Sequence, residues 1–283
     1  MASIQATLQA SQEQLIQAGL VDSPKIDAEL LLCHTLDVNR SYLFTWPEKE
    51  LTAEQTHAFQ NDLQLRLAGH PIAHIIGQRE FWGLNLRVSN NTLIPRPDTE
   101  TLIEAVLNLD GIKNKQAECT ILDLGTGSGA IALALKSELP HCDITAIDQS
   151  QAALEIAREN AISNQLDVQF MQSDWFSAIG QKQYHCIVSN PPYIEEDDPH
   201  LNQGDVRFEP LSALTSGEDG LDDIRLIINQ AWSHLVSQGW LVIEHGYNQA
   251  ESIAELFKET GFQNRTLCKD LGGNPRVSLG QKP

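Results

Sequence analysis

The chain has 283 residues and a formal net charge of −19 at pH 7, from 19 basic and 38 acidic side chains. A charge of this sign repels free nucleic acid, which disfavours functions that depend on neutralising phosphates. Two interpretations of the charge stay open, simple solubility or attraction of a basic protein partner. The length suffices for two domains.

The five cysteines, at positions 33, 119, 142, 186 and 268, contain no C-x-x-C spacing, and several lie in apolar runs. They predict reduced, buried thiols in a cytoplasmic protein. His70 and His74 are separated by Pro71 and have no further ligand cluster nearby, so we expect no metal. The polar start lacks the apolar core of a signal peptide, and no run is long enough for a membrane helix.

Apolar residues recur at helical spacing over residues 4–20, 26–36 and 52–67. Ser23-Pro24 before the second run and Thr52 at the start of the third are typical helix beginnings. The pattern predicts a small N-terminal helical domain, residues 1–72, which we expect to recognise the substrate. A purely structural role for these helices is an equal alternative.

The period of the apolar residues changes to two between residues 73 and 89, beginning with Ile75 and Ile76. This alternation, with Gly83 at the turn, predicts a β-hairpin linker over residues 73–90. A helix over residues 97–109 should then lead into a catalytic domain, residues 91–283.

Strands are predicted near residues 119–124, 143–148, 167–171, 185–190 and 239–244, separated by helices. Alternation of this kind is typical of an α/β fold with a doubly wound, mostly parallel sheet. Two final strands, near 262–268 and 275–280, have only a short turn between them, so we expect an antiparallel hairpin there.

The first of these strands runs directly into a glycine-rich loop that opens a helix. The loop residues are Gly125, Thr126, Gly127, Ser128 and Gly129. Such glycines permit a tight turn and close approach to a ligand, and the helix N-terminus offers unpaired N–H groups. The next strand ends in Asp148, which is placed to accept hydrogen bonds from ribose hydroxyls. The spacing suits an adenosine-containing cofactor.

The G-x-G-x-G spacing departs from the G-x-G-x-x-G of dinucleotide sites and favours S-adenosylmethionine. Asp174 and Trp175 follow the third strand and are expected to meet an adenine. The alternatives are a helix cap for Asp174 and core packing for Trp175.

The fourth strand ends in Asn190-Pro191-Pro192-Tyr193. Each proline fixes φ and removes an amide donor, and Asn190 is held extended by the proline that follows it. An amide, a free carbonyl and an aromatic ring at one point suit a planar group that bears an NH₂. On its own, the tetrapeptide is also compatible with ordinary turn chemistry.

These motifs together resemble class I methyltransferases that modify a planar nitrogen, and more closely the PrmC/HemK family of protein-(glutamine-N5) methyltransferases. The resemblance spans nearly the whole chain. Besides the glycine loop, Asp148, Asp174-Trp175 and Asn190-Pro191-Pro192-Tyr193, it is carried by residues 79–82, 92–100, 207–211, 213–214 and 271–276.

The resemblance implies methyl transfer from S-adenosyl-L-methionine to the glutamine of the GGQ motif in class I peptide chain release factors. The amide clamp, Asn190, Pro191, Pro192 and Tyr193, would bind the substrate, with Asn190, Pro191 and Tyr193 catalytic. The glycine loop, Asp148, Asp174, Trp175 and Asn190 would hold the cofactor. We further expect a monomer without direct nucleic-acid or membrane binding.

Two alternatives remain at this point: an adenine-amino nucleic-acid methyltransferase, which shares the Asn-Pro-Pro-Tyr motif, and a non-catalytic binding module. The acidic run at residues 195–198 is either a solvated loop or a lid for a basic substrate. Glu244 and His245 end the fifth strand, and neither is expected to be catalytic, since neither belongs to the amide clamp.

Overall fold

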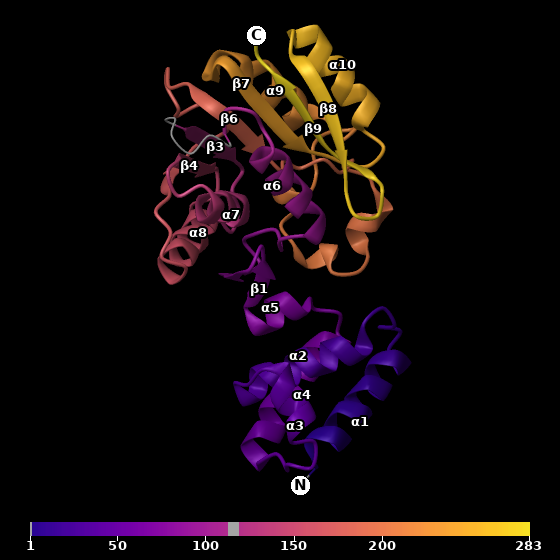
Figure 1. The fold of residues 1–283 in the computed structure, drawn as a ribbon. Coiled ribbons are helices and arrows are strands. Elements are labelled where there is room, and N and C mark those ends of the chain that lie inside the picture. The colour runs from indigo at the N-terminus through magenta and orange to yellow at the C-terminus, as the bar shows by residue number, and fades with distance from the viewer. Residues whose placement is uncertain (1, 113–118) are drawn as a thin grey trace. The chain divides into compact units, whose positions relative to one another are not determined.

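A computed structural model describes residues 2–112 and 119–283 of the chain, which forms two compact units (Figure 1). The helical unit runs to Gln78 and also contains His200–Phe208. The second unit comprises Arg79–Pro199 and Glu209–Pro283, and we call it the methyltransferase unit after the domain that the resemblance predicts. The chain therefore enters the helical unit twice. Within the described residues, no helix has the length and apolar character to cross a membrane.

The helical unit is built from α1 (Ile4–Gln17), α2 (Pro24–Leu36), α3 (Arg40–Thr45), α4 (Ala53–Leu67) and α5 (Ile72–Ile76). The three predicted helices are confirmed, and Thr52 begins α4 through a capping box with Gln55. Two short helices, α3 and α5, were not predicted. The apolar stripes of the longer helices pack together around Leu31, Phe59 and Leu63.

The predicted hairpin is confirmed, but it begins later than the alternation suggested. Its strands are β1 (Gln78–Phe81) and β2 (Leu84–Arg87). Ile75 and Ile76 instead belong to α5. Two adjacent apolar residues fit a short helix as well as a strand, which is why the two-residue period placed the start of the hairpin too early. Trp82 and Gly83 form the turn, both with positive φ, as a two-residue hairpin loop requires.

Residues 200–208, the second segment of the helical unit, are held by an ion pair and a hydrogen bond. Arg66, at the end of α4, lies between Asp27 at 2.7 Å and Asp205 at 3.1 Å. Arg207 donates a hydrogen bond to the carbonyl of Ala68 at 3.3 Å. Residues 200–208 belong to the long stretch that follows the Asn-Pro-Pro-Tyr motif, so that stretch is anchored and is not a free loop.

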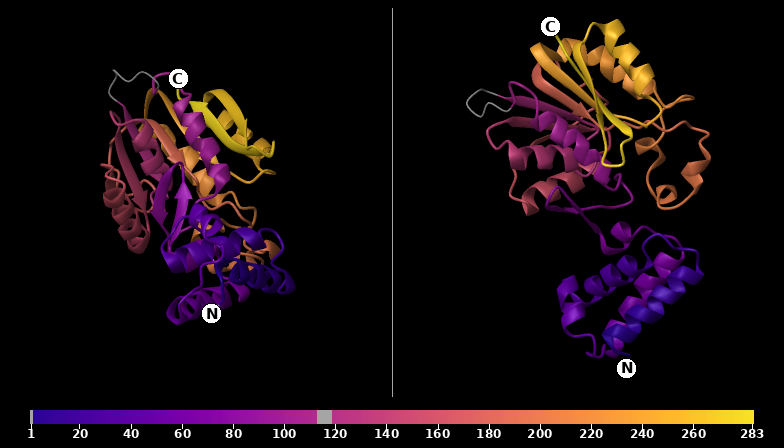
Figure 2. Two further views of the ribbon diagram at one scale, coloured as in Figure 1. Left: turned by 60° about the horizontal axis from the view of Figure 1, so that its bottom comes forward. Right: turned by 45° about the vertical axis from the view of Figure 1, so that its right-hand side comes forward.

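The methyltransferase unit is centred on a twisted sheet, which Figure 2 shows from two further sides. The sheet has seven strands in the order β5-β4-β3-β6-β7-β9-β8. The strands are β3 (Thr120–Leu124), β4 (Asp143–Asp148), β5 (Gln169–Gln172), β6 (Tyr184–Ser189), β7 (Leu235–Glu244), β8 (Gln263–Lys269) and β9 (Pro275–Gln281). The first five are parallel, and β9 runs antiparallel to both neighbours. The predicted doubly wound, mostly parallel sheet and its terminal hairpin are confirmed.

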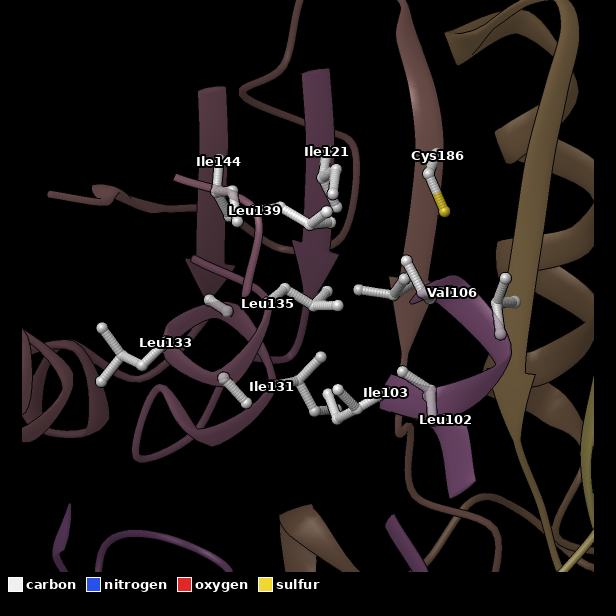
Figure 3. Close-up of a cluster of buried hydrophobic side chains, with 14 of the residues drawn as sticks. Leu102, Ile103, Val106, Ile121, Ile131, Leu133, Leu135, Leu139, Ile144 and Cys186 are labelled. Carbon is white, nitrogen blue, oxygen red and sulfur yellow. The ribbon is translucent and has the colours of Figure 1, made fainter. Parts of the chain in front are cut away.

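Helices cover both faces of this sheet, because its strands alternate apolar side chains between the two faces. Ile121, Ile144 and Cys186 pack against α6 (Glu100–Leu107) and α7 (Ala130–Glu138), as Figure 3 shows. Leu122 and Ile187 point the other way, toward α9 (Asp222–His234) and α10 (Ala250–Thr260). The helix α8 (Gln151–Ser163) links β4 to β5.

Two expected helices differ from the observed structure. The predicted helix over residues 97–109 begins as a 3₁₀ turn, η1 (Pro97–Thr99), before α6. No helix separates β5 from β6, because residues 173–183 form turns. Further 3₁₀ turns, η2 (Pro199–Asn202), η3 (Val206–Phe208) and η4 (Leu211–Ala213), precede α9.

We predict that Arg66→Ala destabilises the helical unit by about 3–5 kcal/mol, because it leaves the carboxylate of Asp27 buried without its counter-charge. Denaturant unfolding measures the loss, and hydrogen exchange should speed up at residues 200–208, which lose the contact with Asp205. Arg87→Ala is the control, since the Arg87–Glu159 pair is exposed and should contribute less than about 1 kcal/mol. Unchanged exchange at residues 200–208 would show that Arg66 does not anchor them.

Candidate active site

A cavity of about 590 Å³ lies in the methyltransferase unit, lined by the ends of the parallel strands and the loops that follow them. The register of the strands explains its position. Leu124, at the end of β3, pairs with Ile147 in β4 and Ser189 in β6. The loops after these strands therefore leave the sheet at one edge, where ligands bind in open α/β sheets.

Most of the residues predicted for the site line this cavity, and three do not. The lining contains Gly125, Thr126, Gly127, Ser128, Asp148, Asp174, Trp175, Asn190 and Pro192. Gly129, Pro191 and Tyr193 are absent from it. The space where Gly129 would carry a β-carbon lies against Ala157 and Leu133, so this glycine serves the packing of α7 and α8.

The glycine loop is held in a left-handed conformation by the polypeptide around it. Gly125 and Gly127 have φ values of +70° and +57°, which side chains rarely adopt. A β-carbon on Gly127 would meet nothing within 4 Å, so the backbone there is open to a ligand. The Thr126 N–H donates to the carbonyl of Ile147 at 2.8 Å, and this bond joins the loop to β4.

Asp148 positions the loop as well as lining the cavity. Its Oδ2 accepts a hydrogen bond from the N–H of Gly127 at 2.9 Å, and its Oδ1 accepts one from Ser150 at 2.8 Å. Burial raises the pKa of Asp148, and these two backbone hydrogen bonds oppose the shift. Each oxygen keeps a lone pair for a further donor, so the predicted contact with ribose hydroxyls remains chemically available.

A second carboxylate lies beneath the same loop. Asp123 is fully buried, and burial raises its pKa to about 7, although the Thr126 hydroxyl donates to its Oδ2 at 2.6 Å. Among the described residues, Oδ1 has no hydrogen-bond partner. The N–H of Ala132 also lowers the pKa of Asp123, so the carboxyl is a buried support of the loop and does not line the cavity.

Trp175 is the aromatic wall of the cavity. Its indole Nε1 donates to Asp223 at 3.0 Å, and a β-carbon on Gly125 would touch its ring at 3.5 Å. Asp174 is exposed beside it. Because residues 173–183 form turns, Asp174 caps no helix, and that alternative is wrong.

Asn190 is one of the residues that line the cavity. Its Nδ2 donates to Thr99 Oγ1 at 3.3 Å, and within the described part of the chain its Oδ1 is buried without a partner. Tyr193 is half-buried against the apolar layer of α9 and α10, with its carbonyl bonded by Gln249 at 3.0 Å. Burial raises the pKa of the Tyr193 phenol, so it stays neutral.

Several residues of the site were not assigned a role from sequence. Asn160 is fully buried and donates to the carbonyls of Arg87 at 3.0 Å and Ser128 at 2.8 Å, which ties the hairpin to the glycine loop. Glu209 pairs with Arg96 and accepts from the N–H of Ile94 at 3.1 Å. The segments 91–96 and 210–213 complete the cavity wall. Several of these residues lie in segments that carry the family resemblance, such as 92–100 and 207–211, but no local pattern indicated what they contact.

Comparison with known proteins identifies the family. Residues 6–77 match the PrmC N-terminal domain model, and residues 100–205 match the methyltransferase small domain model. A release factor glutamine methyltransferase from Vibrio cholerae is 50% identical over 281 residues, which are 99% of this chain and 96% of that protein. The chain belongs to the release factor glutamine methyltransferase family. The Escherichia coli member is 47% identical over 270 residues, 95% of this chain and 96% of that protein.

The fold of this methyltransferase also occurs in solved structures. A methyltransferase from Pyrococcus furiosus superposes with a TM-score of 0.54 at 17% identity, over 79% of this chain and 98% of that one. The resemblance to the PrmC/HemK family and the class I methyltransferase fold are thus confirmed. The glycine loop, Asp148 and the Trp175 wall fit S-adenosyl-L-methionine, the methyl donor of such enzymes.

We predict that Asp148→Ala weakens S-adenosyl-L-methionine binding by about 10- to 150-fold, equivalent to 1.5–3 kcal/mol for hydrogen bonds to a charged acceptor. The loss would combine ribose contacts with loosening of Gly127. Calorimetric titration measures it. Asp143→Ala, at the exposed opposite end of the same strand, is the control. Equal affinities of the two variants would remove Asp148 from the site.

Proposed function

We propose that this enzyme transfers the methyl group of S-adenosyl-L-methionine to the side-chain amide nitrogen of a glutamine in peptide chain release factors, at their GGQ motif. The unpartnered Oδ1 of Asn190 on the cavity wall carries the proposal. A buried acceptor of this kind suits an N–H donor, and a glutamine amide brings two. Relatives that are 47–50% identical and named release factor glutamine methyltransferase support the same substrate.

The chemical difficulty lies in the amide nitrogen, whose lone pair is delocalised into its carbonyl. In our proposal Asn190 Oδ1 accepts one amide hydrogen and the carbonyl of Pro191 accepts the other, so the nitrogen becomes more electron-rich. Acceptors aimed at a developing positive charge act as an oxyanion hole does, with the sign reversed. Tyr193 is proposed to stack on the amide, although neither Pro191 nor Tyr193 lines the cavity in this structure.

Positioning supplies most of the remaining rate. The glycine loop, Asp148, Asp174 and Trp175 are proposed to hold the cofactor, whose sulfonium supplies an activated methyl group. Near-attack alignment of two reactants removes roughly 7–11 kcal/mol of barrier. No general base is assigned, and the amide proton is proposed to leave to water after transfer.

A protein substrate accounts for the chain better than an adenine base does. The Asn-Pro-Pro-Tyr geometry suits either amino group, but a net charge of −19 opposes binding to phosphates. An intact glycine loop and an unpartnered buried acceptor on a residue of the cavity wall argue against a non-catalytic module. We further propose a cytoplasmic monomer that binds class I release factors and makes no direct contact with nucleic acid.

The helical domain, residues 1–72, is proposed to recognise the release factor, with the hairpin linker, residues 73–90, joining it to the catalytic domain, residues 91–283. All the residues that line the cavity lie in the methyltransferase unit. The helical unit instead exposes large apolar side chains, including Phe44 at 58% and Trp46 at 50%. Exposed aromatic residues are frequent anchors of protein interfaces.

We expect Asn190→Ala to lower the rate of methyl transfer by about a hundred- to a thousandfold, the usual loss for one preorganised group of this type. Because its interaction strengthens as the nitrogen gains charge, the affinity for the cofactor should change little. Single-turnover methylation of a purified release factor at saturating cofactor measures the rate.

Two further observations would contradict the mechanism or the substrate. Retention of more than about a tenth of the rate in Asn190→Ala would exclude Asn190 as a rate-determining acceptor. Transfer of label to a release factor with alanine in place of the accepting glutamine would exclude glutamine as the target. Label on DNA offered side by side would favour the nucleic-acid alternative.

Replacing both Phe44 and Trp46 with alanine should raise KM for the release factor by about tenfold, the loss expected for interface anchors worth more than 1 kcal/mol. Cofactor affinity and kcat should be unaffected. Ile162→Ala removes a still more exposed apolar side chain, 78% accessible, from α8 of the other unit and serves as the control. A normal KM in the double variant would exclude these side chains from recognition.

A further inference from the structure

A polar cluster surrounds Asn190 at the edge of the cavity, whose lining includes both Asn190 and Thr99. Ser189 of β6 pairs with Ile243 of β7, so the residues that follow, Asn190 and Glu244, leave adjacent strands side by side. Glu244 is 1% exposed and Thr99 is 4% exposed. Thr99 and Asn190 lower the pKa of Glu244 as hydrogen-bond donors, against its burial, and within the described residues its Oε2 is buried with an acceptor position still open. The three side chains therefore form one polar group, in which Thr99 and Glu244 are buried.

The orientation of the Asn190 amide decides whether it accepts or donates toward the substrate. An asparagine side chain is nearly symmetric in shape, so packing alone does not select which end faces the cavity. The observed orientation has Nδ2 donating to Thr99 Oγ1 at 3.3 Å. The Thr99 hydroxyl can accept this bond only if its own hydrogen points away from Asn190. An ionised carboxylate is an acceptor that can take that hydrogen.

We propose that Glu244 and Thr99 are positioning residues for methyl transfer: ionised Glu244 accepts the Thr99 hydroxyl hydrogen, and Thr99 then holds Asn190 with Oδ1 facing the substrate amide. The negative charge behind the amide also polarises Asn190, which strengthens Oδ1 as an acceptor. When Glu244 is protonated, the Thr99 hydroxyl is free to donate to Asn190, and the amide turns its NH₂ toward the cavity. Two donors then face each other, and the substrate amide is repelled.

The charges around Glu244 place this switch near neutral pH. Burial raises its pKa to about 7, against the hydrogen bonds of the cluster and the positive charge of Arg276 on β9. Asp98 of η1 raises the pKa further, and the neutral Tyr193 phenol also faces Glu244. Arg276 also pairs with Asp98 at 3.2 Å, which weakens the effect of its positive charge on the pKa of Glu244. His245 is engaged separately, by the Gly246 carbonyl and the Ser278 hydroxyl.

The sign of the pH dependence follows directly. Below the pKa the carboxyl is neutral and the productive orientation is lost, whereas above it the carboxylate is charged and the orientation is held. With a pKa of about 7, the ionised fraction at pH 6 is about a tenth of that at pH 8. The rate should therefore rise about tenfold over this interval and then level off.

This inference rests on the proposed function, and the first experiment measures single-turnover methylation of a release factor between pH 5.5 and 8.5 at saturating cofactor. The unmodified enzyme should show the tenfold rise. Glu244→Gln should be about 10- to 100-fold slower at pH 8 and insensitive to pH. Thr99→Val should be similarly slow, and Thr99→Ser should restore both rate and pH profile. Cofactor affinity should be unchanged in all of them.

The matched control is Glu29→Gln, which neutralises an equally buried carboxyl, 1% exposed, in α2 of the helical unit. It should keep the rate and the pH profile of the unmodified enzyme. A normal pH profile in Glu244→Gln would overturn the proposal, as would full activity of Thr99→Val.

A second readout separates this inference from the function itself. The side-chain amide resonances of Asn190, assigned by comparison with Asn190→Ala, should titrate with a midpoint near 7 in the unmodified enzyme and stay constant in Glu244→Gln. This measurement needs no substrate. Absence of methylation on any release factor would overturn the proposed function, whereas amide resonances that ignore Glu244 would overturn the positioning role alone.

Discussion

The register of four parallel strands is the constraint on which the site depends. Leu124 is opposite Ile147 on one side and Ser189 on the other, and Ser189 is opposite Ile243. The glycine loop, Asp148, Asn190 and Glu244 each follow one of these positions directly. A slip of one residue in any strand would turn its apolar side chains to the wrong face of a sheet that is buried on both. The packing of the core therefore fixes the chemistry at the edge.

Hydrogen bonds from buried polar side chains hold the loops that follow these strands. Asn160 meets carbonyls from the hairpin and the glycine loop at once, so both backbone segments are positioned by one side chain. Asn190 differs in that one end is satisfied by Thr99 and the other is not, within the described residues. An unmet buried acceptor costs about 1–3 kcal/mol, and in the proposed function the substrate amide relieves this cost.

The connection between β6 and α9 belongs to both units of the protein. It leaves the methyltransferase unit after Pro199, is held by Arg66 in the helical unit, and returns at Glu209. Glu209 then pairs with Arg96, and the residues directly after it line the cavity. The wall of the cavity is thus continuous in the chain with a segment that the helical unit stabilises. The acidic residues 195–198 precede that segment and have no assigned role.

The sequence by itself determined the strand order along the chain, the helical N-terminal region and the residues at each strand end, because apolar periodicity and turn chemistry are local. It failed for Ile75 and Ile76, where two adjacent apolar residues fit either period, and for residues 173–183, where no helix forms. Glu244 is the clearest limit. Its distance in the chain from Asn190 hides their proximity, and only the pairing of β6 with β7 brings them together. The orientation of the Asn190 amide likewise depends on Thr99, a partner that arrives from another element, so only the tertiary structure decided it.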